Sequence, residues 1–83
     1  MTSEPFFHEA SGTVRFWVLI DGKEVGAMIG KETLHYLYRP TAVDDVPLDT
    51  FAIHAEELDA AVRRRMALGA FVPVLVRERD LAT

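Results

Sequence analysis

The stretch that decides the fold is residues 13–29, which reads TVRFWVLI, then DG, then KEVGAMI. Its two apolar halves are rich in β-branched and aromatic side chains, which is typical of β-strands. Asp21-Gly22 lies between them, and this dipeptide favours a two-residue type I′ turn because both positions need positive φ. We therefore predict a β-hairpin with strands over 13–20 and 23–29.

The turn also sets the register of the hairpin, because it places Ile20 opposite Lys23. One face then carries only apolar pairs, namely Val18 with Val25, Phe16 with Ala27 and Val14 with Ile29. The other face pairs Leu19 with Glu24, Trp17 with Gly26 and Arg15 with Met28. A slip of one residue would exchange the two faces, so the apolar segregation supports this register.

Two helices are predicted after the hairpin. The first covers 30–38, and Pro40 ends it. The second covers 47–68, with Asp45 as its cap, Pro47 in its first turn and Gly69 just after its end. Its inner face at helical spacing consists of Leu48, Phe51, Ala55, Leu58, Val62 and Met66.

A third strand is predicted over 70–77, with Val72, Val74 and Val76 on one face. Pro73 cannot donate to a strand ladder, so we expect this strand at an edge or a bulge. The predicted fold class is α+β with two layers: a hairpin, a short helix, a long helix and a further strand, in an antiparallel-rich sheet with the helices on one face. Residues 1–12 form a partly ordered lead-in, in which Phe6-Phe7 could join or cover the sheet, and residues 13–83 form a single domain.

Several of these segments resemble a small uncharacterised bacterial family known as domain of unknown function 1488. The resembling residues are Val14-Arg-Phe16, the Asp21-Gly22 turn, Ile29-Gly-Lys-Glu-Thr-Leu34, Phe51-x-x-His54, Leu58 with Ala60-Ala61, Gly69, Val74-Leu-Val76 and Asp80-Leu81. They span most of the chain after residue 12 and are mainly core and turn positions. The resemblance implies a compact α+β domain and a bacterial source, and it implies no activity.

Composition excludes several classes of function. The 83 residues contain no cysteine, which excludes disulfides and thiolate chemistry, and the net charge of −4 disfavours nucleic acid and anionic lipid as partners. The longest apolar run, 16–20, is far too short to span a membrane, and the first residues do not resemble a secretory signal. We therefore expect a cytoplasmic protein.

The residues that could carry chemistry form no recognisable catalytic set. His8, His35 and His54 lack metal-ligand spacing, and Ser11 lies in the N-terminal segment, away from any predicted base. The basic run Arg63-Arg64-Arg65 suits the negative end of the long helix. We assign no catalytic, cofactor-binding or metal residue, and we expect neither a cofactor nor an enzymatic activity.

The function that these features favour is protein interaction. The second face of the hairpin is too apolar for free exposure to water, so a protein partner, including a second copy in a homodimer, is expected to cover it. The candidate interaction surface comprises Trp17, Leu19, Met28, Ile53, His54 and Arg65. The alternative is a small-molecule or anion-binding module with its site near His54 and the Arg63–Arg65 end of the long helix.

Overall fold

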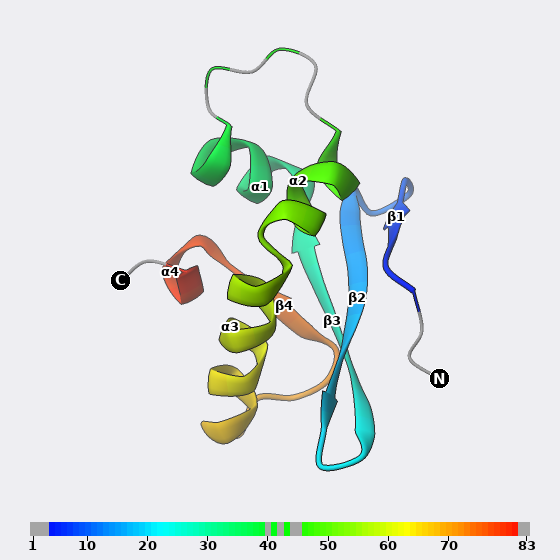
Figure 1. Ribbon diagram of the computed structural model, residues 1–83, viewed down its shortest axis with the longest axis vertical. Helices are drawn as coiled ribbons and strands as arrows, with labels where there is room; N and C mark the ends of the chain where they lie inside the picture. Colours follow the sequence, from blue (N-terminus) through cyan, green and yellow to red (C-terminus); the bar gives the residue numbers. More distant parts are fainter. Residues whose placement is uncertain (1–3, 40, 42, 44–45, 82–83) are drawn as a thin grey trace.

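The computed structural model describes residues 4–39, 41, 43 and 46–81 (Figure 1). These residues form an α+β fold, as the sequence predicts. The strands are β1 (Phe6–His8), β2 (Thr13–Ile20), β3 (Lys23–Gly30) and β4 (Val74–Val76). The helices are α1 (Lys31–Tyr38), α2 (Pro47–Ile53), α3 (Ala55–Ala67) and α4 (Glu78–Leu81).

The sheet has the order β1-β2-β3-β4, with β4 at one edge, as Pro73 indicated. The hairpin of β2 and β3 has the predicted register throughout, with Ile20 opposite Lys23 and Val18 opposite Val25. β1 pairs antiparallel with β2, and β4 pairs parallel with β3. The sheet is therefore mixed, although two of its three pairings are antiparallel.

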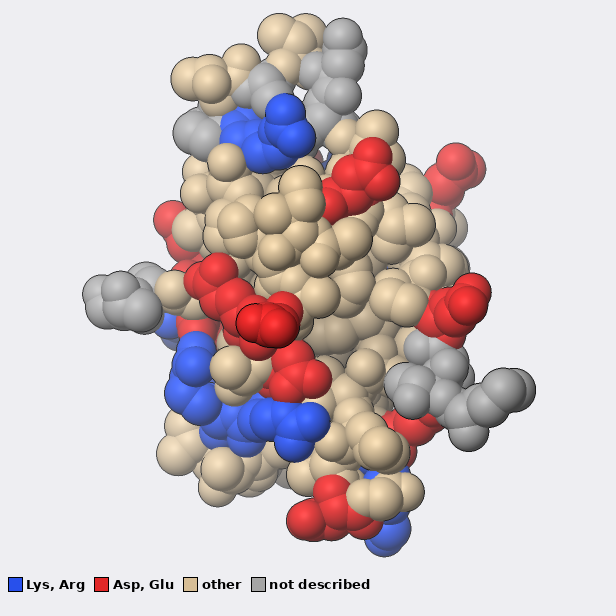
Figure 2. Space-filling model, viewed as in Figure 1, with Lys and Arg blue, Asp and Glu red and all other residues tan. Residues whose placement is uncertain are grey.

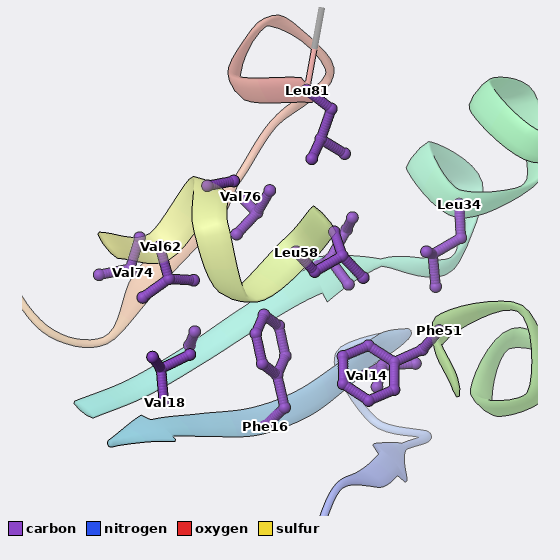
Figure 3. Close-up of a cluster of buried hydrophobic side chains, with 13 residues drawn as sticks. Val14, Phe16, Val18, Leu34, Phe51, Leu58, Val62, Val74, Val76 and Leu81 are labelled. Atoms are coloured by element: carbon purple, nitrogen blue, oxygen red, sulfur yellow. The ribbon is translucent and has the colours of Figure 1, made fainter. Parts of the chain in front are cut away.

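The helices pack on one face of this sheet and enclose the core (Figures 1 and 3). Phe16 from β2 meets Phe51 from α2 with ring centroids 4.8 Å apart. Val14 and Val18 are buried beneath the helices, as the apolar face of the hairpin predicts. The other large core side chains come from β3, the helices and β4, and include Ile29, Leu34, Leu58, Val62, Val74, Val76 and Leu81.

The prediction of one long helix over 47–68 is wrong in one respect, because the helix is interrupted at His54. This residue has φ −109° and ψ 20°, and it separates α2 from α3. The apolar face is preserved across the interruption, since Phe51, Leu58 and Val62 are all buried. The helix begins at Pro47 with Val46 as its N-cap; the predicted cap, Asp45, lies outside the described residues.

The predicted strand over 70–77 is also shorter than expected. Only Val74–Val76 pair with β3, and both Phe71 and Val72 are exposed, so Val72 does not share the inner face with Val74. Pro73 lacks the N–H that a ladder needs, which explains why pairing begins after it. Gly69 has φ 89° and follows α3 in the left-handed conformation that the sequence predicted.

Candidate interaction surface

The side chains opposite the core form a second face, which we call the outer sheet face. Besides the row of His8, Thr13 and Gly30, strand register arranges this face in three rows. The first row crosses all four strands, because Phe6 lies opposite Arg15, Arg15 opposite Met28, and Met28 opposite Leu75. The second and third rows follow along the hairpin and consist of Trp17 with Gly26 and Leu19 with Glu24.

The outer sheet face exposes large apolar side chains from three strands. Phe6 is 42% exposed, Leu19 is 49% exposed and Leu75 is 38% exposed, while Trp17 and Met28 are half-buried. The described helices contribute the core side chains on the opposite face of the sheet, so none of them covers these residues. Adjoining apolar side chains of this kind mark a candidate interaction site.

Trp17 is held in place by its two neighbours on this face. A Cβ atom built on Gly26 would lie 3.7 Å from the indole Nε1 of Trp17, so the ring covers the backbone that the glycine leaves bare. Phe6 packs against the same indole with ring centroids 5.9 Å apart and planes inclined by 30°. β1 therefore joins the sheet and brings Phe6 against Trp17, which remains half-buried.

Arg15 is the cation within the first row, between the apolar neighbours Phe6 and Met28. Its Nε is buried and has no hydrogen-bond partner in the described part of the chain. A buried donor left unpaired costs about 1–3 kcal/mol. The outer sheet face therefore carries an unsatisfied cationic donor among its apolar side chains.

His54 and Ile53, two other members of the predicted surface, lie elsewhere, at the junction of α2 and α3. The imidazole of His54 stacks on the ring of Tyr38 from α1, with centroids 3.6 Å apart and planes inclined by 8°. Its Nδ1 lies 3.8 Å from the carboxylate of Glu57. Burial, together with the nearby Glu57 carboxylate, raises the pKa of Tyr38 to about 12. His54 thus joins three helices, while Ile53 beside it is exposed and belongs to neither the core nor the outer sheet face.

The arginine run makes contacts within the chain. Arg63 donates to Asp59 and to the Leu19 carbonyl oxygen, and Arg64 donates to the backbone oxygen of Asp80. Arg65 donates to the Asp80 carboxylate at 2.7 Å and to the Leu75 carbonyl oxygen at 3.2 Å. In Figure 2 the basic side chains adjoin acidic ones over α3. Arg65, a predicted surface residue, therefore holds β4 and α4 against α3.

The turn between β1 and β2 contains a contact that sequence reasoning missed. Ser11 Oγ lies 2.7 Å from His8 Nδ1 and 2.7 Å from Thr13 Oγ1, so the prediction that Ser11 is remote from any base is wrong. The Ser11 and Gly12 N–H groups also bond to His8, through its Nδ1 and its carbonyl oxygen respectively. Such local bonds are typical of side-chain-capped turns. They hold β1, and with it Phe6, beside β2.

Neither a metal-binding cluster nor a membrane-spanning helix occurs in the described part of the chain. Within residues 4–39, 41, 43 and 46–81, histidine and acidic side chains do not gather in any group of three or more that could hold a metal ion. In the same part of the chain, no helix combines the length and apolar composition needed to cross a bilayer.

Comparison of the chain with protein-family models, with curated proteins and with solved structures returns no match. The resemblance to domain of unknown function 1488 therefore remains a prediction from the sequence.

Proposed function

We propose that this chain is a non-enzymatic protein-interaction domain of the bacterial cytoplasm, and that the outer sheet face is its contact surface. The observation that supports the proposal most strongly is the set of apolar side chains on that face, Phe6, Trp17, Leu19, Met28 and Leu75, which the helices do not cover. Aromatic residues, Met and Arg are the residue types enriched at the centres of protein interfaces. The resemblance to domain of unknown function 1488 is consistent with this proposal and adds no activity to it.

The alternative of an anion or small-molecule site near His54 has less support. The open hollow beside His54, of about 410 Å³, is lined by Glu56 and Glu57 together with small and apolar side chains. Carboxylates repel an anion, and the three arginines that could have attracted one already donate to Asp59, Asp80 and backbone oxygens. The geometry near His54 therefore favours a structural role for this histidine.

Site-specific photo-crosslinking tests the proposal. A photoreactive phenylalanine analogue replaces Leu75 on the outer sheet face or, as a control, Leu68, which is exposed at the end of α3. Irradiation of cells that produce each variant should crosslink a protein to position 75 and leave position 68 unlinked. Equal crosslinking at both positions, or none at position 75, would exclude the outer sheet face as an interaction surface.

A further inference from the structure

The outer sheet face carries one cation and one anion in a diagonal arrangement. Arg15 lies on β2, two residues before Trp17, and Glu24 lies on β3, two residues before Gly26. Because β2 and β3 are antiparallel and Trp17 lies opposite Gly26, the two charges stand at opposite ends of the face, on neighbouring strands. This arrangement is self-complementary, since a two-fold axis can exchange the two positions.

We infer that the partner of the outer sheet face is a second copy of this chain, packed sheet against sheet, with Arg15 of each copy paired to Glu24 of the other. The inference rests on the proposed function and names its partner. Arg15 is half-buried between Phe6 and Met28, so a carboxylate from the second copy would pair with its guanidinium in partly desolvated surroundings. A charge-assisted bond of this kind is stronger than a neutral one.

The two-fold axis that exchanges Arg15 and Glu24 lies in the contact plane and passes between Trp17 and Gly26. With strands about 4.8 Å apart and a rise of about 3.3 Å per residue, this axis sets the strands of one copy at an angle of about 40° to the strands of the other. Sheets that pack face to face in proteins are inclined by roughly 30°, so the size of this angle is close to that of ordinary sheet packing.

The same axis matches the apolar side chains of the two copies. It brings the Trp17 indoles of the two copies against each other, because each lies next to the axis. It also places Phe6 of one copy over Leu19 of the other, so that the two most exposed apolar side chains of β1 and β2 cover one another. The same two-fold arrangement of the two copies therefore pairs both the charged and the apolar side chains of the face.

The size of the face predicts how tight the dimer is. The hairpin strands are about 26 Å long, but β1 and β4 have three residues each and add strips of only about 10 Å, so the face measures about 220 Å² per copy. A stable complex of standard size buries about 800 Å² per partner. We therefore expect a weak dimer whose population rises with protein concentration.

Sedimentation equilibrium of the full chain and its charge variants tests the inference. Arg15→Glu and Glu24→Arg should each weaken self-association by about tenfold or more, because each turns two attractive pairs into two repulsive ones. An equimolar mixture of the two variants should restore association, since their heterodimer again pairs opposite charges. Glu9→Arg and Arg79→Glu carry the same charge changes at exposed sites off the face and should leave association unchanged. Circular dichroism checks that each variant is folded.

The inference fails if the wild-type chain is monomeric at high concentration, if the single variants associate normally, or if the mixture does not recover association. The proposed function has a separate outcome. A monomeric chain whose position 75 still crosslinks another protein would overturn the second copy as partner and leave the interaction surface intact. A chain that neither associates nor crosslinks at position 75 would overturn both.

Discussion

Replacing Asp80 by alanine tests whether α4 and β4 are fixed to α3 by a partly buried ionic contact. One oxygen of the Asp80 carboxylate accepts hydrogen bonds from Arg65 at 2.7 Å and from the Arg77 N–H at 2.8 Å. The carboxylate side chain is only 11% exposed and that of Arg65 is 31% exposed. Bonds to a charged group contribute about 1.5–3 kcal/mol each and are not additive, so Asp80→Ala should lower the free energy of unfolding by about 2–3 kcal/mol.

Urea denaturation followed by far-ultraviolet circular dichroism measures this loss. Since 1 kcal/mol shifts the Tm of a domain of this size by about 4–8 °C, the Tm should fall by roughly 10–20 °C. The Leu75 carbonyl oxygen also accepts a bond from Arg65, so the variant should loosen β4 and weaken any association through the outer sheet face.

Asp59→Ala is the matched control, because Asp59 also pairs with an arginine of α3. Its bond to Arg63 measures 2.5 Å, but the two side chains are 43% and 50% exposed. An exposed pair at this helical spacing contributes about 0.3–0.5 kcal/mol. Equal losses for Asp59→Ala and Asp80→Ala would refute the reasoning that burial, rather than bond length, sets the strength of these contacts.

Three further predictions concern the aromatic stack, the glycines and the core. Absorbance titration should place the pKa of Tyr38 near 12 in the folded protein and near 10 in the unfolded chain. Because the unfolded chain then loses this proton first, the free energy of unfolding should fall between about pH 10 and pH 12. Tyr38→Phe should abolish that fall. In urea denaturation, Gly26→Ala should change the free energy of unfolding by under about 0.5 kcal/mol, whereas Gly69→Ala, at φ 89°, should lower it by about 1 kcal/mol. Equal losses for the two variants would contradict this prediction. Leu58→Ala should cost about 2–5 kcal/mol by the same assay and exposed Leu68→Ala almost nothing.

Of the six residues in the predicted interaction surface, three lie on the outer sheet face and three lie in the helical layer, where the predicted hairpin and the predicted helix over 47–68 place them. Trp17, Leu19 and Met28 followed from the hairpin register, which depends only on the turn and on the alternation of side chains. Ile53, His54 and Arg65 lie in the helical layer, away from that face. Their positions depend on contacts between segments far apart in the chain, such as the stack of His54 on Tyr38.

What the sequence determined by itself is local in origin: the Asp21-Gly22 turn, the register of β2 and β3, the inner face of the helices and the left-handed Gly69. Each follows from the conformational preference of one or two residues or from a repeat of side chains along one element. A single element contains all the information that such features need.

Tertiary structure alone decided the addition of β1 to the sheet, the parallel pairing of β4, the interruption at His54 and the ionic contact of Arg65 with Asp80. These features depend on the combined burial and hydrogen bonding of elements that are distant in sequence. The pattern of residues within one segment does not predict such contacts. The outer sheet face shows both origins, because local register orients Trp17 outward, whereas the pairing of distant strands brings Phe6 and Leu75 to its sides.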